Sequence, residues 1–172
     1  GDKIQARGAM ESVGLPVAKG SDEPIQGSIK ARSIADEIGY PVIIKAAAGG
    51  GGIGMQVVEE PESFEDALRI CTGRAESAFG DGRVFVEKFI EGAQHVEFQV
   101  LCDGEKAIHF GERFCSIQRR HQKLIEEGPW LTEEVRLKMG DLVCKGAESV
   151  KYKGLATFEF LRDSSGEVYF LE

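Results

Sequence analysis

The stretch Tyr40-Pro-Val-Ile-Ile-Lys45-Ala-Ala-Ala-Gly-Gly-Gly-Gly-Ile-Gly54-Met55 carries the clearest signal in this chain. An apolar run ends in one lysine, a loop with almost no side chains follows, and the residues from Met55 onward again have the character of a strand. A backbone without side chains can approach a polyphosphate closely and point its N–H groups at it. Lys45 adds a positive charge, so the stretch predicts a strand, a glycine loop and a strand that bind nucleotide phosphates.

Two other glycine-rich motifs fit this stretch poorly. A Walker-type loop ends in Gly-Lys-Ser/Thr and opens a helix, whereas here the lysine precedes the loop and a strand follows it. A dinucleotide fingerprint also opens a helix and requires an acidic residue further along the chain. The remaining alternative is a glycine-rich hairpin turn without a ligand, which is a costly arrangement because ordering four consecutive glycines loses much backbone entropy.

The bulk composition limits the class of protein. The 172 residues fit one domain or two small lobes, and a hydrophobic content of 42% allows a real core. A formal net charge of −8 argues against nucleic-acid binding, so any phosphate site must be a local basic cluster. The 4 cysteines include no C-x-x-C pair, which argues against zinc and favours reduced thiols in the cytoplasm. No apolar run is long enough to span a membrane, and no secretory signal is present.

Periodicity and turn residues predict an α+β order of elements. The expected helices cover residues 2–14, 28–38, 61–79 and 132–150, and the expected strands cover residues 41–46, 54–59, 83–89, 95–102, 107–115, 155–162 and 167–172. We interpret residues 17–89 as a small lobe, 90–172 as a larger lobe, and 1–16 as a helix and linker after a preceding domain. The chain starts without methionine and stops inside an expected strand, so we expect a fragment of a longer protein.

Two glutamates on the last two expected strands are candidate metal ligands. If Asp163 and Gly166 close a two-residue hairpin loop, Glu159 and Glu172 lie on one face as diagonal neighbours, roughly 7–8 Å apart at Cα. Two such carboxylates can share Mg²⁺ ions with substrate phosphates. A three-residue loop would turn Glu172 to the other face. The alternative is a pair of solvent-facing glutamates without a metal.

Other polar residues form two further candidate groups. Glu87 and Lys88 end a strand that joins the two expected lobes, where backbone groups and the lysine can contact an adenine ring; an ordinary surface charge pair is the alternative. Gln118-Arg-Arg-His-Gln-Lys123 is a compact basic and amide cluster suited to an anion. Because two glutamates follow this cluster, a local network of salt bridges is an equally open interpretation. His95 heads a strand and, by itself, favours a structural role.

Taken together, these residues resemble the biotin carboxylase component of the biotin-dependent carboxylases, which is an ATP-grasp enzyme. The resemblance covers essentially the whole chain, and its most specific part is the Gln118–Lys123 string. The matching stretches are Gly1–Lys3, Gly39–Lys45, Gly49–Gly54, Val86–Lys88, His95–Val100, Cys115–Lys123, Ala156–Phe160 and Tyr169–Glu172. The resemblance implies an α+β ATP-grasp fold of two lobes, with a glycine-rich lid and a truncated second lobe.

The resemblance also implies roles for individual residues. It implies that Lys123 helps to bind bicarbonate, while Gln118 and His121 lie near the nucleotide and the reaction centre. It implies that Glu159 and Glu172 ligate two Mg²⁺ or Mn²⁺ ions. The residues implied to bind ATP are Lys3, Lys45, Gly50, Gly51, Gly52, Gly54, Glu87, Lys88, Phe89, Ile90, His95, Gln118, His121 and Glu159.

The reaction implied by the resemblance begins when bicarbonate attacks the γ-phosphate of ATP to give carboxyphosphate. The carboxyl group then passes to biotin on a carrier domain, and a carboxyltransferase uses it, for example in fatty acid biosynthesis. An anion that attacks a polyanion needs clustered cations, metal ions and exclusion of water. The family further implies a homodimer for the full-length enzyme, no nucleic-acid or membrane partner, and a location in the cytoplasm or the mitochondrial matrix.

Several departures and alternatives accompany the resemblance. Ala48 and Ile53 replace a glycine and a basic residue usual in the family, and Phe114 replaces an acidic one with no evident consequence. The family's Asn-x-Arg-x-x-x-Glu-His segment and its N-terminal domain are missing, so we expect that this chain alone does not carboxylate biotin. The alternatives are another bicarbonate-activating ligase of the carbamoyl-phosphate synthase type, which the Gln118–Lys123 string disfavours, and an ATP-binding module without turnover.

Overall fold

The computed structural model describes residues 3–25, 27–48, 54–119 and 122–172. The chain divides into two compact units, which we call the small unit (residues 18–89) and the large unit (residues 1–17 together with 90–172). Residues 1–17 thus group with the large unit, and the assignment of residues 1–16 to a helix and linker after another domain stays a prediction. Within the described residues, no helix combines the length and the hydropathy needed to cross a membrane.

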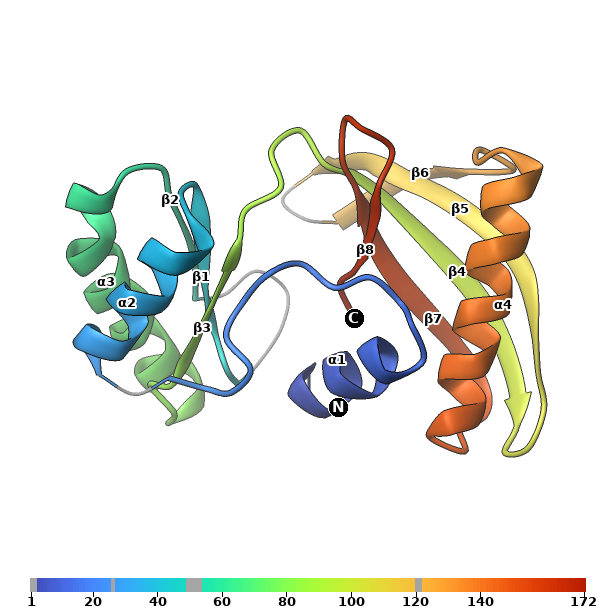
Figure 1. Ribbon diagram of the computed structural model, residues 1–172, viewed down its shortest axis with the longest axis horizontal. Coiled ribbons are helices and arrows are strands. Elements are labelled where there is room, and N and C mark those ends of the chain that lie inside the picture. Colours follow the sequence, from blue (N-terminus) through green and yellow to red (C-terminus); the bar gives the residue numbers. More distant parts are fainter. Residues whose placement is uncertain (1–2, 26, 49–53, 120–121) are drawn as a thin grey trace. The chain divides into compact units, whose positions relative to one another are not determined.

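The small unit is a three-stranded antiparallel sheet with helices on one face (Figure 1). Its strand order is β2 (Met55–Val58), β1 (Val42–Ala46) and β3 (Val84–Lys88). The helices are α2 (Ser28–Ile38) and α3 (Phe64–Phe79), and the short 3₁₀ turn Pro61–Ser63 precedes α3. These elements agree with the predicted order of strand, loop, strand, helix and strand.

Alternation along β1 separates the two faces of this small sheet. Val42 and Ile44 are fully buried and join the residues of α2 and α3 in one apolar core. Ile43 and Lys45 point to the opposite face, as period-two geometry requires. We call this second face, which carries the predicted phosphate-binding lysine, the open face of the small sheet.

The large unit is built on a five-stranded antiparallel sheet in the order β6-β5-β4-β7-β8 (Figure 1). The strands are β4 (Gln94–Asp103), β5 (Ala107–Arg119), β6 (Gln122–Glu127), β7 (Lys153–Arg162) and β8 (Val168–Phe170). Strand β6 was not predicted, and β5 continues beyond the predicted end at residue 115. The hairpin of β5 and β6 carries the Gln118–Lys123 string.

Two helices cover one face of the large sheet. Helix α4 (Glu133–Ser149) packs on β4 and β5, and α1 (Lys3–Ser12) packs on α4. A Cβ atom on Gly146 would lie 2.5 Å from Met10 Sδ, and one on Gly140 would lie 2.3 Å from the His109 ring. Both positions therefore need glycine so that neighbouring side chains can approach the helix axis closely. The opposite face of this sheet, which we call the open face of the large sheet, carries the odd-numbered β4 residues from 95 to 101.

Glu112 is a buried carboxylate that fixes the segment before α4. Its Oε1 accepts hydrogen bonds from the backbone N–H groups of Trp130 at 2.8 Å and Leu131 at 2.7 Å. Its Oε2 accepts a 2.7 Å bond from Nε of Arg136, and the Glu112 side chain is 0% exposed. Because four N–H donors, two of them on Arg136, match the charge, it is a stabilising rather than a costly burial.

These contacts predict an acid dependence of stability. Burial alone would raise the pKa of Glu112, but hydrogen bonds from Arg136 and from the Leu131 and Trp130 N–H groups outweigh it and lower the pKa to about 2. A lowered folded-state pKa adds stability that is present above the unfolded value near 4.5 and is lost as pH falls towards 2. By this linkage the ionised Glu112 carboxylate contributes about 3 kcal/mol to the free energy of unfolding at neutral pH.

The measurement is urea unfolding of the wild type and of Glu112→Gln between pH 7 and 2. We expect the difference in unfolding free energy between the two proteins to shrink across the range from about 4.5 to 2. Using the difference removes the contributions of other carboxylates that titrate in the same range. A difference that stays constant with pH would show that the Glu112 charge does not stabilise this segment.

The structure gives Phe114 a role that the sequence did not reveal. Its ring stacks on Trp130 with centroids 4.6 Å apart and an interplanar angle of 28°. The guanidinium carbon of Arg162 lies 5.1 Å from the centroid of the same indole ring. Phe114 thus extends an aromatic and cationic stack over the segment that Glu112 also holds, where an acidic residue could not stack.

Candidate functional site

Lys45 and Glu87 form the polar centre of the open face of the small sheet. Lys45 stands opposite Met55 on β2 and Phe85 on β3, so Glu87 is its diagonal neighbour on the same face. Nζ of Lys45 lies 2.5 Å from Oε2 of Glu87, and both side chains are about one-fifth exposed, at 18% and 20%. A lysine held on a sheet face among Ile43, Met55 and Phe85 is a suitable partner for a phosphate, with Glu87 as its internal counter-ion.

Lys88 is already engaged by the backbone of its own unit. Its Nζ donates to the carbonyl oxygens of Gly39 at 3.0 Å and Tyr40 at 2.9 Å. The Lys88 and Phe89 N–H groups donate to Lys19 O at 2.7 Å and to Pro41 O at 3.1 Å. The predicted adenine contacts of Glu87, Lys88, Phe89 and Ile90 stay predictions, and any contact with Lys88 Nζ must compete with these two carbonyl groups.

Part of the predicted nucleotide site lies outside the described residues. This holds for Gly50, Gly51 and Gly52 of the glycine loop and for His121. Lys3 is in helix α1. Gly54 is described, and its φ of +75° belongs to the left-handed region that favours glycine. A Cβ atom there would lie 2.9 Å from Cβ of Ala46, so the return of the chain into β2 excludes any side chain at this position.

A charged cluster occupies the middle of the open face of the large sheet, and we call it the Glu97 cluster. Its members come from four strands: Glu97, Arg113, Lys123, Glu126 and Glu159. The Glu97 carboxylate bonds both Arg113 and Lys123, and its side chain is 2% exposed. Nζ of Lys123 also donates to Oε1 of Glu159 at 2.6 Å, and Arg113 pairs with Glu126.

Sequence reasoning missed Glu97 as the centre of this cluster. The period-two alternation of β4 does place Glu97 on the face opposite Val96 and Phe98, which was a usable signal. What the sequence did not show is the register: Glu97 stands opposite Arg113 on β5 and opposite Glu159 on β7. The consecutive strands β4 and β5 and the distant strand β7 thus bring their charged residues into one row.

The electrostatics of the Glu97 cluster keep its lysine charged and its cysteine neutral. Burial lowers the pKa of Lys123, but hydrogen bonds to Glu159 and Glu97 outweigh it, so the pKa is raised above its usual value. Cys115 lies beside the cluster, and burial, followed by the Glu97 charge, raises its pKa to about 11. Lys123 can therefore hold an anion at neutral pH, whereas Cys115 is protonated and is a poor nucleophile.

The hairpin that carries Glu159 and Glu172 differs from the predicted one. The two-residue loop is wrong, because Asp163 N–H donates to Glu167 O at 2.9 Å and Phe160 stands opposite Phe170. Residues 164–166 form the loop, closed by a turn from Gly166 N–H to Asp163 O at 3.1 Å with Gly166 at φ +95°. This is the three-residue loop with a left-handed glycine that is common in hairpins.

A bulge at the end of the chain brings Glu172 back beside Glu159. Glu159 N–H donates to Glu172 O at 2.7 Å, whereas Glu159 O accepts from Leu171 N–H at 2.8 Å. Two residues, Leu171 and Glu172, therefore oppose the single residue Glu159, which is the pattern of a β-bulge. The backbones of the two predicted metal ligands are adjacent through this bulge, and not through the predicted register. Their role as ligands stays a prediction.

Two other predicted site residues lie near the Glu97 cluster. Gln118 is the direct cross-strand neighbour of Lys123, and its Nε2 donates to the Cys115 carbonyl oxygen at 2.9 Å. The His95 N–H donates to Ser116 Oγ at 2.7 Å, and His95 shares the open face with Glu97. The structure thus gathers Lys45, Gly54, Glu87 and Lys88 in the small unit, and His95, Gln118, Lys123, Glu159 and Glu172 in the large unit.

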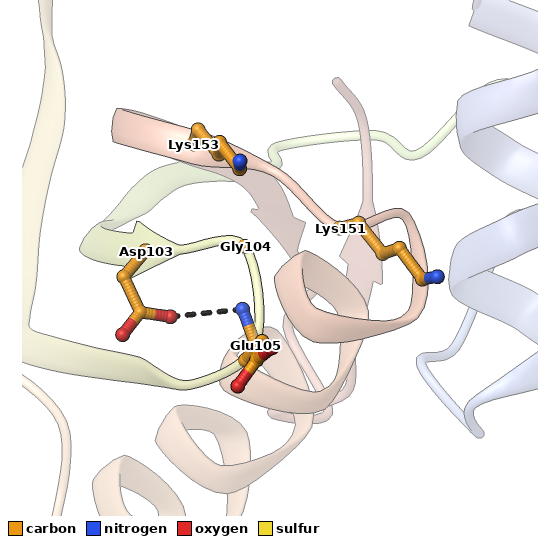
Figure 2. Close-up of a pocket in the computed structure, with 5 residues that line it drawn as sticks. All are labelled: Asp103, Gly104, Glu105, Lys151 and Lys153. Atoms are coloured by element: carbon orange, nitrogen blue, oxygen red, sulfur yellow. Dashed lines mark hydrogen bonds between the residues drawn. The ribbon is translucent and has the colours of Figure 1, made fainter.

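A surface cavity of about 330 Å³ lies away from these residues, at the turn between β4 and β5 (Figure 2). Asp103, Gly104, Glu105, Lys151 and Lys153 line it. The Asp103 carboxylate accepts the N–H groups of Glu105 and Lys106, each at 2.8 Å, and so caps its own turn. None of the predicted site residues lines this cavity, and the Asp103 carboxylate serves the turn.

Comparisons with known proteins agree on the family. A family model described as the ATP-binding domain of the carbamoyl-phosphate synthase L chain matches residues 2–172. Biotin carboxylase 1, chloroplastic, from Populus trichocarpa is 48% identical over 175 residues, which cover 100% of this chain and 33% of that protein. The chain thus spans about a third of the length of that relative.

Solved structures of biotin carboxylases have the same fold as this chain. The biotin carboxylase of Campylobacter jejuni, described as a β-γ-ATP complex, has a TM-score of 0.94 at 48% identity and covers 99% of this chain and 39% of its own. A second structure is the biotin carboxylase domain dimer of Hydrogenobacter thermophilus 2-oxoglutarate carboxylase, described with MgADP, ADP and bicarbonate. It has a TM-score of 0.94 at 44% identity, and the match covers 100% of this chain and 39% of that one. The chain belongs to the family of the carbamoyl-phosphate synthase L chain ATP-binding domain, with the ATP-grasp fold of the biotin carboxylases that it resembles in sequence.

Proposed function

We propose that the chain is the ATP-binding core of a biotin carboxylase, an ATP-dependent ligase that uses bicarbonate to carboxylate biotin on a carrier domain. The observation that carries the proposal is the Glu97 cluster, in which Lys123 is kept cationic by Glu97 and Glu159 on a protein with a net charge of −8. Lys123 already pairs with Glu97 and Glu159, so an anionic partner would share its ammonium group with these two carboxylates. The Hydrogenobacter thermophilus domain, which is described with MgADP, ADP and bicarbonate, suggests the chemical class of that partner.

Each unit has residues suited to one part of this reaction. On the small unit, Lys45 is suited to contact the phosphates of ATP. On the large unit, Lys123 is suited to hold bicarbonate, with Gln118 as its cross-strand neighbour. A bicarbonate oxygen attacks the γ-phosphorus, the bond from this phosphorus to the ADP oxygen breaks, and carboxyphosphate forms. Cationic groups such as Lys45 and Lys123 reduce the repulsion between the two anions.

The donor set at the end of the large sheet fits a divalent cation. Glu159 and Glu172 offer carboxylate oxygens from adjacent backbone positions, and Mg²⁺ prefers one or two carboxylates together with phosphate oxygens. In the structure Lys123 donates to Glu159, so an ammonium group is placed where a cation is favoured. When bound, Mg²⁺ would supply charge neutralisation at the phosphates.

Partners and location extend the same proposal. We propose a biotin carboxyl carrier domain and a carboxyltransferase as partners in the longer enzyme, and a homodimer like the one named for the Hydrogenobacter thermophilus domain. All 4 cysteines are free in the structure, which favours a reducing compartment such as the cytoplasm. The mitochondrial matrix, the other location considered, has no support in the relatives described above, one of which is named as chloroplastic.

A second candidate function is a bicarbonate-activating ligase of the carbamoyl-phosphate synthase type. The description of the matching family model favours it. The relatives reported above are instead biotin carboxylases at 44–48% identity, which favours the first proposal. A nucleotide-binding module without turnover is the third candidate, and it shares the ATP site but not the anion-binding role of Lys123.

The proposal is tested by nucleotide titration of the chain, monitored by calorimetry or ligand-observed NMR with and without Mg²⁺. We expect Mg²⁺ to strengthen ATP binding in the wild type. Because Glu159→Gln removes one proposed metal ligand, we expect it to lose about tenfold in MgATP affinity, in the range reported for weakened metal sites. Glu167→Gln is the matched control, since Glu167 is an exposed residue of the same hairpin.

Two results would contradict the proposal. One is a wild-type chain that shows no nucleotide binding at millimolar ATP. The other is a Glu159→Gln variant in which Mg²⁺ increases the affinity for ATP as much as it does in the wild type and in Glu167→Gln. Bicarbonate titrated into the MgATP complex separates the candidates further, because an ATP-binding module without turnover has no reason to bind it.

A further inference from the structure

Gln99 is a half-buried amide on the open face of the large sheet, beside the Glu97 cluster. It lies two residues beyond Glu97 on β4, so the two side chains share this face. Its Nε2 is 3.2 Å from Glu97 Oε1, and its Oε1 is 3.1 Å from Thr157 Oγ1. Neither Gln99 nor Thr157 was predicted as a site residue, and both contacts lead into the cluster.

The pairing of β4 with β7 places four polar residues in a block. Thr157 stands directly opposite Gln99, and Glu159 stands directly opposite Glu97. Residues that stand opposite each other in an antiparallel sheet have Cβ atoms about 4.5–5.5 Å apart, so the side chains of each row can meet. The Glu97 row holds two like charges, whereas the Gln99 row beside it is neutral and supplies hydrogen-bond donors.

The chemistry of Glu97 fixes the direction of these hydrogen bonds. An ionised carboxylate only accepts, so the Gln99 amide must turn its NH₂ group towards Glu97 and its carbonyl oxygen towards Thr157. The Thr157 hydroxyl group therefore donates to Gln99, and Gln99 donates to Glu97. We call these three residues, Thr157, Gln99 and Glu97, the Gln99 network.

The Gln99 network selects the oxygen of Glu97 that is left for Lys123. Gln99 and Arg113 both donate to Oε1 of Glu97. Lys123 bonds the other oxygen, Oε2, and also donates to Oε1 of Glu159 at 2.6 Å. The last torsion of a glutamate side chain is soft, so donors on one carboxylate oxygen limit where the other can lie. The ammonium group of Lys123 is thereby held at a defined place between two carboxylates.

We infer that Gln99, oriented by Thr157, is a positioning residue for Lys123, the lysine proposed to hold bicarbonate. Gln99 acts through the Glu97 carboxylate and is not a catalytic residue. If Glu97 could rotate freely, the ammonium group of Lys123 would occupy several positions, and an anion would bind at the cost of ordering it. The link to bicarbonate rests on the proposed function, whereas the link from Gln99 to Lys123 rests on the contacts alone.

The test centres on Gln99→Met, which keeps the length of the side chain but loses both hydrogen bonds. Two quantities are measured by NMR on the 172-residue chain: the exchange of the Lys123 ammonium protons with water, and the affinity for isotopically labelled bicarbonate at saturating MgADP. We expect faster exchange and about 3- to 10-fold weaker bicarbonate binding, the range of a single hydrogen bond. The affinity for MgADP should not change, because the Gln99 network acts on Lys123 and not on the nucleotide.

Three further variants probe the same network. Thr157→Val loses only the hydroxyl donor and should change both quantities in the same direction but less, because Thr157 is exposed and water can replace part of its role. Thr157→Ser keeps a hydroxyl group and should behave as the wild type. The matched control is Leu155→Val, an exposed position two residues earlier on the same face of β7, which should change neither quantity.

The two readouts separate this inference from the proposed function. Unchanged Lys123 exchange in Gln99→Met would overturn the inference whatever the bicarbonate result. Faster exchange without weaker binding, in a chain whose wild type binds bicarbonate, would also overturn it, as would an equal loss of MgADP affinity, which would indicate a disturbed site. If the wild type binds neither bicarbonate nor MgADP, the proposed function fails, and Lys123 exchange alone then decides whether Gln99 positions the lysine.

Discussion

A Glu97→Leu variant is expected to lose about 2–4 kcal/mol of unfolding free energy, near the lower part of the range for breaking a buried ion pair. The Glu97 side chain is 2% exposed and bonds two cations, so its removal leaves Arg113 with Glu126 alone and Lys123 with Glu159 alone. The loss falls short of the full range because Arg113 and Lys123 are 40% and 24% exposed and reach water.

The measurement is equilibrium unfolding in urea, with Glu126→Leu as the matched control. Glu126 bonds Arg113 from the exposed side of the same cluster, so removing it should cost about 0–1 kcal/mol, as for surface ion pairs. Glu97→Gln should lie between the two, because it keeps the shape and some hydrogen bonds. Equal stability of Glu97→Leu and Glu126→Leu would mean that the cluster is not organised around Glu97.

A Lys45→Met variant is expected to weaken ATP binding by about 10- to 100-fold, since it removes a partly buried charge from the proposed phosphate site. Methionine keeps the length and most of the apolar contacts of the lysine stem. The exposed Lys30, whose Nζ is 3.9 Å from a Glu23 oxygen, provides the control Lys30→Met in the same unit. Calorimetric titration with MgATP is the measurement, and high salt should reduce the difference between wild type and Lys45→Met.

A second variant distinguishes loss of the lysine from exposure of its counter-ion. In Lys45→Met the Glu87 carboxylate remains at the proposed phosphate site without its lysine partner, and there it is expected to repel the ligand. The double variant Lys45→Met/Glu87→Gln removes this repulsion, so we expect it to bind MgATP more tightly than Lys45→Met alone. Wild-type affinity in Lys45→Met would exclude the phosphate role of Lys45.

Strong local patterns made much of the fold predictable. The alternation of β4, the Asp103-Gly104 turn, the Thr132 cap of α4 and the strands around the glycine stretch all depend on neighbours within a few residues. Strand β6 was missed because residues 116–127 are mostly polar and show no alternation. Strand β6 forms because it pairs with β5, with irregular register at the bulges between them, and this pairing has no local signal in the sequence.

The parts that could not be predicted depend on register and on contacts between distant residues. The hairpin at Asp163–Gly166 contains residues compatible with a two-residue or a three-residue loop, and one step in register moves every side chain to the other face. Glu97 meets Arg113 and Glu159 only through the pairing of three strands. Phe114 finds Trp130 because Glu112 anchors the segment between β6 and α4, a contact with no signature in the sequence around either ring.

Two glycines in α4 influence how readily this segment becomes helical during folding. Gly140 and Gly146 each lower the intrinsic helix preference by about 0.8–1 kcal/mol relative to alanine. The same two positions admit His109 and Met10 against the helix backbone, contacts that exist only once the sheet and α1 are in place. Helicity between residues 133 and 149 thus depends on tertiary contacts in addition to local preference, so the isolated segment is expected to be less helical than it is in the folded protein.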